Sequence, residues 1–391
     1  MSLDIPILKP QYIQRTIEQF TPDPKKFRGI DFCPVVPSNN PISWDIMMGV
    51  GGLIPPVVLD AESPRMKTPG MQQMSTSPGY FRGKSVFTEK DLTELRMPGT
   101  LDQIYGKKMV FDRLATMDAQ IESTVEWFRW KSLSGIVPIR GNGLNFDVDY
   151  KIPTHFKPTA GVAWSDTANA DPLVDIATWK ALMIGTGLQL KKFWFTSVVE
   201  KYLLFNAVIR DITKRSVTNG RVTKDVLTEL MGDYEVYDQG YTIQAQLTAS
   251  AAKDAVTIIL DDATGIEIGD KITLNMGMDN EERVTISEID NTVLTISALA
   301  SSKSVGATAS TFKTFIPNDK FIMKSEPFSG NSMEFATVPS LFTGLDNPKP
   351  GKFTKIVDLT DVDRPSVEVI GGIYGAVKRL YKTDCIYADV A

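Results

Sequence analysis

The longest regular pattern of apolar and polar positions lies between residues 109 and 134. Apolar side chains recur there every three or four residues, which is the spacing of one face of an α-helix. The stripe consists of Phe111, Leu114, Met117, Ile121, Val125 and Phe128. The polar positions on the other side are Asp112, Asp118, Gln120, Glu122, Glu126 and Arg129. Because Gly135 follows as a helix C-cap, the pattern predicts one helix of about 25 residues with its apolar stripe in a core.

The next patterns alternate between helix and strand. Asp171-Pro172 is an N-cap followed by a proline at the first helical position, which predicts a helix through Met183. The elements expected after it are a strand at Leu190–Thr196, helices at Val198–Lys214 and Lys224–Met231, and a strand at Tyr234–Ile243. This order is typical of an α/β subdomain.

Residues 246 to 312 change character, because no helical periodicity remains and strand and turn signals repeat. The expected strands are Val256–Leu260, Lys271–Leu274, Glu282–Ile289 and Thr292–Ser297. Four to five short strands in this length predict a small all-β barrel or sandwich. Its acidic run Asp279–Glu282 lacks the ligand spacing of a calcium loop, so we interpret it as a solvated turn.

The two ends of the chain are less regular. Residues 1 to 48 contain one helical candidate, Gln11–Phe20, and indicate an extended arm that packs on another surface. Glycines and prolines interrupt residues 49 to 99 so often that we expect a long two-stranded excursion, with Phe81–Lys90 as its returning limb. The last stretch is β-rich and closes with a strand at Cys385–Val390.

Composition and charge narrow the class of protein. The chain has 391 residues, of which 42% are hydrophobic and 23% charged, so it can fold around one large core or a few smaller ones. Its formal net charge is -5. Residues 246 to 312 carry 4 basic and 10 acidic residues, which leaves 38 basic and 37 acidic residues elsewhere. A nearly neutral body offers no strong basic face for nucleic acid.

The sequence contains few residues of the types that usually catalyse reactions or bind metals. The only histidine, His155, is flanked by prolines and has no nucleophile or acidic partner in its surroundings, so we interpret it as structural or surface-exposed. Cys33 and Cys385 lie near opposite ends of the chain and cannot form a zinc site without further ligands. Asp147 and Asp149 share one strand face, which we expect to be solvated. We therefore predict no enzyme, no metal and no cofactor.

The sequence predicts neither a nucleotide site nor a membrane segment. Gly83-Lys84-Ser85 matches the end of a phosphate loop, but its leading glycine would have to stand at position 78, which is Pro78. No stretch approaches about 18 consecutive apolar residues, and the N-terminus has no basic and apolar signal pattern. We expect a soluble chain made in a reducing cytoplasm, without membrane contact.

The order of parts resembles a known family. The sequence resembles the major capsid proteins of tailed phages, which have the Hong Kong 97-type fold, and specifically the phage lambda-type (E family) branch. The stretches that carry the resemblance are Ser77–Phe81, Ala163–Asp166, Asp171-Pro172, Phe195 with Tyr202 and Phe205, Phe315–Lys320 and Cys385–Ala391. Their collinearity along the chain supports it more than any single stretch does.

The resemblance implies an α+β fold with an N-arm, an E-loop, a spine helix, and peripheral and axial domains, to which this chain adds an inserted all-β module. The implied parts are residues 1–48 (N-terminal arm), 49–100 (E-loop), 101–171 (peripheral domain with spine helix 109–134), 172–245 and 313–340 (axial domain), 246–312 (inserted module) and 341–391 (return to the peripheral domain).

The function that the resemblance implies is a major capsid protein. It would self-assemble as hexamers and pentamers into the icosahedral head that encloses phage DNA, in the virion capsid, after assembly in the host cytoplasm. Scaffold and portal proteins and a decoration protein are the expected partners, and DNA would be held non-specifically. Arg82, Lys84 and Lys90 are candidate assembly contacts to acidic neighbour surface. The alternatives are an encapsulin-like nanocompartment shell and an adhesive or carbohydrate-binding protein that acts through the β-module.

Overall fold

A computed structural model of the chain describes residues 26–48, 70–91, 101–141, 144–216, 222–328, 330–340, 350–359 and 366–391. The helical candidate Gln11–Phe20 and most of the tip of the expected excursion lie outside these residues. The chain forms two compact units. The first comprises Met1–Arg129 and Pro327–Lys382, and the second comprises Trp130–Glu326 and Thr383–Ala391.

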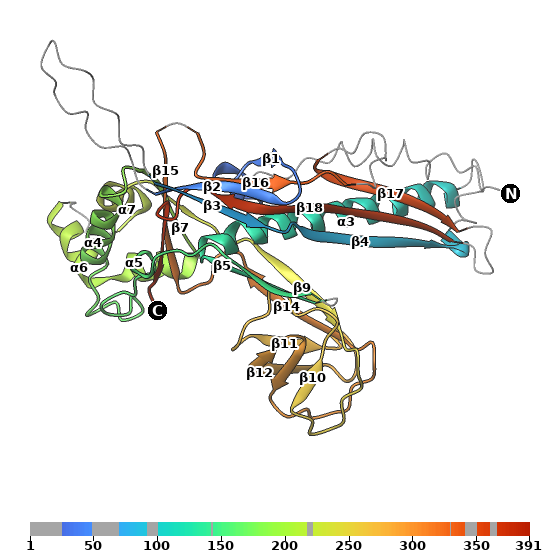
Figure 1. The fold of residues 1–391 in the computed structure, drawn as a ribbon. Coiled ribbons are helices and arrows are strands. Elements are labelled where there is room, and N and C mark those ends of the chain that lie inside the picture. Colours follow the sequence, from blue (N-terminus) through green and yellow to red (C-terminus); the bar gives the residue numbers. More distant parts are fainter. Residues whose placement is uncertain are drawn as a thin grey trace, which may run out of the picture. The chain divides into compact units, whose positions relative to one another are not determined.

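The first unit is built on a five-stranded sheet whose long central strand is β18 (Ser366–Arg379) (Figure 1). β4 (Gly79–Thr88) pairs with β18 antiparallel on one side. β17 (Lys352–Leu359) and β16 (Met333–Thr337) also pair with β18 antiparallel, and β1 (Val35–Pro37) adds a parallel edge to β16. A one-turn 3-10 helix, η2 (Arg28–Asp31), precedes β1.

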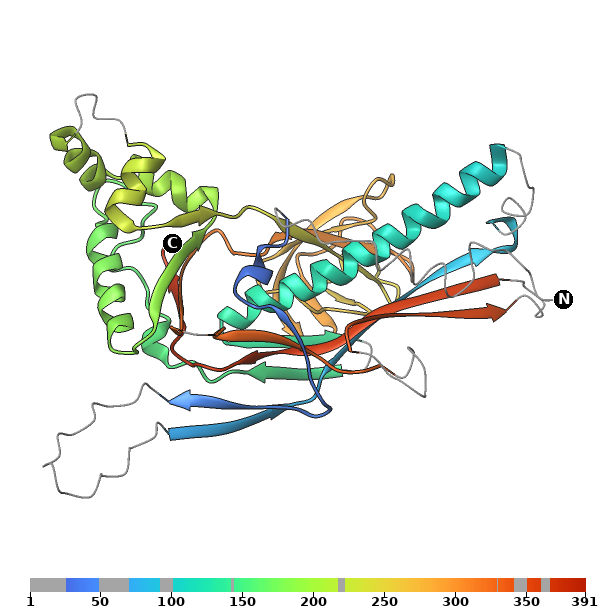
Figure 2. The same ribbon diagram turned by 90° about the horizontal axis from the view of Figure 1, so that it is seen from above.

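The long helix α3 (Leu101–Leu133) begins eight residues before the predicted start and ends one residue before the predicted end. Gly135 has a φ of +92°, as the expected C-cap requires. Both views of the ribbon show α3 alongside β4 and β18 (Figures 1 and 2). The helix and β18 are in close contact, because a Cβ built on Gly371 of β18 would lie 2.6 Å from Met117 Cε, and the flexible Met117 side chain would have to move to admit one.

The burial of α3 differs from the prediction in two ways. Phe111, expected in the core, is 50% exposed, whereas Phe128 is fully buried against the rings of Phe81 and Phe335. The polar residues Asp118, Glu122, Glu126 and Arg129, expected on the opposite face, are buried. The reason is that α3 is covered on more than one side, and buried partners from distant parts of the chain satisfy its charges.

The excursion also pairs differently from the prediction. β2 (Ile42–Met48) and β3 (Gly70–Thr76) form a two-stranded antiparallel ribbon. The predicted returning limb, Phe81–Lys90, instead forms β4 of the main sheet. Both segments alternate, so the sequence pattern alone could not select the strand that pairs.

The second unit contains a four-stranded sheet in the order β19-β15-β7-β8. Its strands are β7 (Gln189–Phe195), β8 (Tyr234–Val236), β15 (Lys320–Glu326) and β19 (Cys385–Asp389). Phe321 is at the centre of an aromatic cluster with Trp164, Trp179, Phe193 and Phe195. The β5 (Ile136–Gly141) and β6 (Leu144–Asp149) hairpin and the 3-10 helix η3 (Thr154–Phe156) belong to the same unit.

The helices of this unit are α4 (Pro172–Ile184), α5 (Ser197–Phe205), α6 (Ala207–Ser216) and α7 (Lys224–Met231). The Asp171 side chain accepts the Val174 N–H at 3.3 Å, which confirms the predicted N-cap. The single helix expected over Val198–Lys214 is wrong, because Asn206 has an extended backbone. Its side-chain oxygen accepts the N–H groups of Val208 and Ile209 and so starts α6.

Residues 240 to 314 form a six-stranded sheet in the order β10-β13-β12-β11-β14-β9. Its strands are β9 (Gly240–Gln246), β10 (Thr257–Ile259), β11 (Lys271–Leu274), β12 (Glu282–Asp290), β13 (Val293–Ile296) and β14 (Thr308–Thr314). The four predicted strands are confirmed. The strand expected over Tyr234–Ile243 is two strands, because β8 and β9 belong to different sheets.

Candidate assembly surfaces

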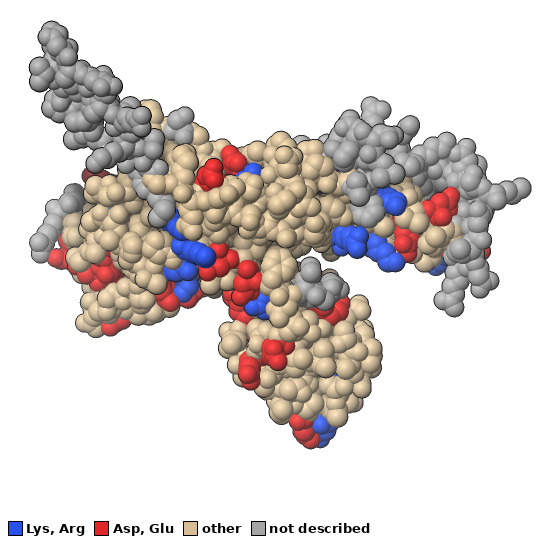
Figure 3. All heavy atoms as spheres, in the orientation of Figure 1, with Lys and Arg blue, Asp and Glu red and all other residues tan. Residues whose placement is uncertain are grey.

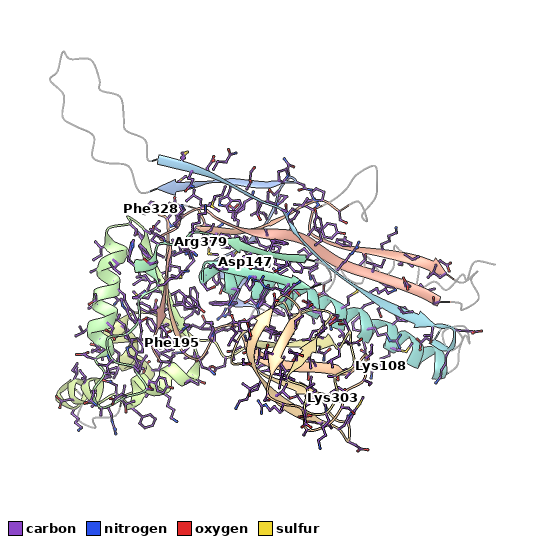
Figure 4. The ribbon with its side chains drawn as sticks, turned by 60° about the horizontal axis from the view of Figure 1, so that its bottom comes forward. Lys108, Asp147, Phe195, Lys303, Phe328 and Arg379 are labelled. Carbon is purple, nitrogen blue, oxygen red and sulfur yellow. The ribbon has the colours of Figure 1, made fainter. Side chains whose placement is uncertain are left out.

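The residues examined for catalysis or metal binding do not form a site. His155 is exposed in η3 with its ring 4.7 Å from that of Phe156, and Asp147 and Asp149 are exposed on β6. Asp147 pairs with Arg140 at 2.6 Å (Figure 4). Cys33 and Cys385 are both buried and are not joined in a disulfide. In the part of the chain that the structure describes, no group of His, Cys, Asp and Glu side chains could hold a metal ion.

The described helices include none that is long and apolar enough to cross a membrane.

The three predicted contact residues lie on the first unit, on and after β4. Arg82 and Lys84 are opposite Gly372 and Ile370 of β18, and Lys90 lies in the helical turn that follows β4. All three are exposed, and Lys84 Nζ is 2.8 Å from Glu368 Oε1. They therefore lie on or just after β4 of the main sheet and not on the β2–β3 ribbon.

A groove of about 620 Å³ runs between β4 and α3. Gly83, Lys84 and Ser85 of β4 line it on one side. The helix contributes Lys108, Met109, Asp112, Arg113, Thr116, Met117 and Gln120. Sequence reasoning missed this side, although Lys108, Asp112, Thr116 and Gln120 recur every four residues and so share one helical face. We call this feature the β4–α3 groove.

Asp91 fastens the end of β4 to the helix. Its carboxylate accepts the Thr88 N–H at 3.1 Å and lies 3.0 Å from the Arg113 guanidinium. Burial acts to raise the pKa of Asp91, but the hydrogen bonds from Thr88 and Arg113 outweigh it and hold that pKa below its usual value. Arg113 also donates to the Val86 carbonyl at 3.0 Å, so one guanidinium joins the helix to the strand twice.

Buried carboxylates on α3 hold other parts of the first unit. Lys352 of β17 is 2.6 Å from Asp118 and 2.5 Å from Glu122. The Gly29 N–H donates to Glu126 Oε1 at 2.6 Å, and Arg129 lies 3.3 Å from the other oxygen of that carboxylate. The polar side of α3 therefore binds β17 and the Gly29 backbone within the first unit.

The β2–β3 ribbon is anchored on one face and open on the other. Ile42, Trp44 and Ile46 are buried, and Trp44 Nε1 donates to the Arg379 carbonyl at 2.8 Å. Met47 and Met71 are 41% and 62% exposed. A ribbon of two strands is marginally stable alone, so its open face suits contact with another surface.

The six-stranded sheet carries a second exposed apolar group at one end. Met276, Met278 and Val305 are each at least 60% exposed. The loops that carry them are joined by Lys303, whose buried Nζ donates to the Asn280 carbonyl at 2.5 Å and lies 3.2 Å from Glu282 (Figure 4). The apolar side chains are thus displayed on loops held by a buried ion pair.

At its other end, the six-stranded sheet is joined to its own unit through Glu267. This carboxylate pairs with Lys131 at the end of α3 and with Lys313 of β14 at 2.8 Å. Burial acts to raise the pKa of Glu267, but the charges of Lys131 and Lys313 lower it to about 2. Thr264 adds a hydrogen bond from the backbone N–H of Arg140 on β5 at 3.0 Å.

The distribution of charge separates these surfaces. Lys and Arg side chains gather over the part of the first unit where β4 lies, while the visible face of the six-stranded sheet is mostly uncharged (Figure 3). The ten carboxylates of residues 246–312 therefore do not form one continuous acidic face on the side seen there.

A long helix packed along a five-stranded sheet, with a separate two-stranded ribbon, places the chain in the α+β class. The sequence model of the family described as phage major capsid protein E matches residues 39–268, more than half of the chain. The chain belongs to the phage major capsid protein E family.

One solved structure shares the fold, and two others are similar with lower scores. A protein assigned as a prophage capsid protein, from E. coli CFT073, has a TM-score of 0.50 and 14% identity, with 100% of this chain and 99% of that chain covered. The capsid of Myoviridae phage XM1 gives 0.42 and 12%, over 96% and 95% of the two chains. The SrpI encapsulin of Synechococcus elongatus PCC 7942 gives 0.41 and 8%, over 96% and 89%. No curated protein sequence matches the chain.

The family membership confirms the resemblance drawn from the sequence and the α+β capsid fold. The chain is a phage major capsid protein, a structural and non-enzymatic component of the virion whose copies assemble into the shell of the icosahedral head.

Proposed function

We propose that copies of this chain form hexamers and pentamers, and that the exposed parts of the first unit make the contacts between copies. In this proposal residues 1–48 are the N-terminal arm and 49–100 the E-loop. Residues 101–171 and 341–391 form the peripheral domain, and residues 172–245 with 313–340 form the axial domain. The observation that carries the proposal is the β2–β3 ribbon, which is anchored through Trp44 and leaves Met47 and Met71 exposed.

We assign residues 246–312 to an inserted β-module that faces outward from the shell. Its support is that β9 and β14 lie side by side, with Gly240 opposite Thr314, so the chain enters and leaves at one place. The six-stranded sheet also encloses sixteen buried apolar residues of its own. A segment with adjacent ends and a separate core is typical of a tolerated insertion.

The proposed partners follow from the role of a phage head. A scaffold protein and a portal protein would direct assembly, and the exposed Met276, Met278 and Val305 offer a surface for a decoration protein. Packaged DNA would be held by confinement and without base recognition, because the body of the chain is nearly neutral.

Electron microscopy of the purified full chain, alone and co-expressed with its scaffold, tests the assembly. We expect closed shells or free capsomers with sixfold and fivefold symmetry. A preparation that contains only monomers under both conditions would contradict the proposal.

The insertion is tested by removing residues 247–307 and joining Gln246 to Thr308 through an Asn-Gly turn. Gln246 and Thr308 are paired across the ribbon of β9 and β14, so a two-residue turn can close the two strands there. We expect this variant to form shells of the same diameter as the full chain. Soluble monomer that no longer assembles would count against an independent module.

A further inference from the structure

The six-stranded sheet closes on itself. β10 and β9 are the two end strands of its order, and the chain pairs once more just beyond them. Leu247 lies opposite Leu260, and the Thr248 N–H donates to the Ile259 carbonyl at 2.9 Å. Because closure removes the strand edges, another molecule would bind to the loops or outer faces of this sheet rather than add a strand to it.

Two loops at one end of this sheet carry exposed apolar side chains. Residues 275–281 join β11 to β12, and residues 297–307 join β13 to β14. Met276, Met278 and Val305 on these loops are 69%, 60% and 63% exposed. We call these three side chains the methionine surface. Methionine is flexible and polarizable, so such a surface adapts to apolar partners of different shapes.

Buried polar side chains fix the two loops against each other. The buried Lys303 Nζ donates to the Asn280 carbonyl at 2.5 Å and lies 3.2 Å from Glu282 Oε2 (Figure 4). The Asn275 side chain is buried as well, donates to Asn280 Oδ1 at 3.0 Å and accepts the Thr308 N–H at 3.2 Å. Since these bonds hold the loops in place beforehand, little conformational entropy would be lost when a partner binds.

The charges beside the methionine surface are acidic. Residues 275–282 and 300–306 contain one cation, Lys303, and three carboxylates, Asp279, Glu281 and Glu282. Lys303 is buried against Glu282, whereas Asp279 and Glu281 are exposed. Two exposed carboxylates without an exposed cation on either loop favour a basic partner. The same charges disfavour contact between the methionine surfaces of two copies, because like charges would face each other.

We propose that the methionine surface is a docking site for another protein, which presents an apolar side chain flanked by Lys or Arg. This inference rests on the proposed function, because the outward-facing module would carry the surface to the outside of the shell. It specifies the chemistry of the partner. Apolar contact with the two methionines supplies most of the affinity, and Asp279 with Glu281 attracts and orients the basic groups.

Fluorescence anisotropy with two synthetic peptides tests the chemistry of the partner. Both are short labelled amphipathic helices, one of leucine and lysine and the other of leucine and glutamate. The full chain should bind the leucine–lysine peptide at least about tenfold more tightly than the leucine–glutamate peptide. The double variant Met276→Ser with Met278→Ser should weaken this binding about tenfold. The control is Ile268→Ser, at a position 66% exposed on the other end of the sheet, which should change the binding by less than about twofold.

Several outcomes would overturn the proposal. They are no binding of the leucine–lysine peptide, equal binding of the two peptides, and unchanged binding by the double variant. Thermal unfolding should be the same for the double variant and for Ile268→Ser, because all three side chains are exposed. Sedimentation without peptide tests the other occupant: weaker self-association of the double variant would assign the surface to a second copy and would also overturn the proposal.

Oxidation of methionine by hydrogen peroxide separates this inference from the proposed function. The leucine–lysine peptide should slow formation of the sulfoxides of Met276 and Met278, measured by mass spectrometry, in the soluble chain and in shells alike. Met71, which is 62% exposed on the β2–β3 ribbon, should be oxidised in the soluble chain at the same rate with and without peptide. Equal protection of Met71 would overturn the docking site. Protection of Met276 and Met278 in the soluble chain but not in shells would support the docking site and contradict the outward placement of the module.

Discussion

The main sheet of the first unit and the six-stranded sheet differ in how completely they bury their apolar side chains. The six-stranded sheet encloses sixteen apolar residues in one cluster within a segment of 75 residues, 240–314. Within the described residues, the first unit pairs β4 on one side only. Met71 is 62% exposed, and Phe328, labelled in Figure 4, is 90% exposed. The difference indicates that the six-stranded sheet has a core of its own, whereas the first unit exposes apolar surface that suits contact with a neighbour.

Both regions nevertheless pair their buried charges. Glu126 and Arg129 lie 3.3 Å apart in the first unit, and Lys303 and Glu282 lie 3.2 Å apart in the six-stranded sheet. The first pair lies one turn apart on α3, whereas the second joins the loop before β14 to the start of β12. These buried charges are therefore balanced by partners of opposite sign in both regions.

The largest effect is expected from the core of the first unit. Phe128→Ala should lower the free energy of unfolding by about 3–5 kcal/mol, because the ring is fully buried between Phe81 and Phe335. The matched control is Phe111→Ala, whose ring is 50% exposed and should cost less than about 1 kcal/mol. Denaturant unfolding of the soluble chain measures both. Equal losses would show that the exposed and buried faces of α3 are wrongly assigned.

A core substitution in the six-stranded sheet should have a smaller and local effect. Leu274→Ala removes a fully buried side chain and should destabilise this sheet by about 2–4 kcal/mol. Val293→Ala, at a position 37% exposed, is the control. Limited proteolysis reports the local loss, and electron microscopy should still show shells. Loss of shells with Leu274→Ala would mean that the two regions are not independent.

The ion pairs of Glu267 with Lys131 and Lys313 should make the free energy of unfolding depend on pH. Folding lowers the pKa of Glu267 from 4.5 to about 2, so the folded chain binds this proton less readily than the unfolded chain. The stabilisation is complete above about pH 4.5 and disappears as the pH falls towards 2. Because the side chain is 43% exposed, solvent screening reduces its contribution to about 1 kcal/mol.

Urea unfolding at several pH values measures this contribution. Glu267→Gln should remove the extra loss of stability between pH 5 and pH 2, by roughly that 1 kcal/mol, while Glu288→Gln, on an exposed position of β12, should leave it unchanged. Identical pH profiles for both variants would show that Lys131 and Lys313 do not hold this carboxylate ionised.

The smallest effect on folding is expected at the surface of β4. Lys84→Ala should change the free energy of unfolding by no more than about 1 kcal/mol, because its pair with Glu368 is exposed to solvent. Lys90→Ala provides a control at an exposed position that has no ion pair among the described residues. Thermal unfolding of the unassembled chain is the measurement. A loss of several kcal/mol would mean that Lys84 has a structural role within the subunit.

Local patterns in the sequence were sufficient for much of the secondary structure. Residues close together in the chain were enough to predict three features. These are the end of α3 before Gly135, the N-cap at Asp171 and the strand Lys271–Leu274. The same periodicity failed for the burial of α3. Asp118 and Glu126 are buried because Lys352 and Gly29 reach them, and the sequence does not reveal such distant partners.

The candidate assembly surface could be predicted only in part from the sequence, for the same reason. Lys84 could be chosen as an exposed basic residue of an alternating strand, but its strand was assigned to the wrong partner. Gly83 and Lys108 became parts of one groove only when β4 paired with β18 beside α3. A four-residue recurrence of polar positions on α3 was the signal that could have indicated the helical wall.

Hydrogen exchange of the soluble chain and of assembled shells tests the contrast between the two regions most directly. Assembly should slow exchange at β4 and in the β2–β3 ribbon, where contact between copies covers the strands, and should leave exchange in β11 and β12 unchanged. Slower exchange confined to β11 and β12, with β4 and the ribbon unaffected, would contradict this prediction.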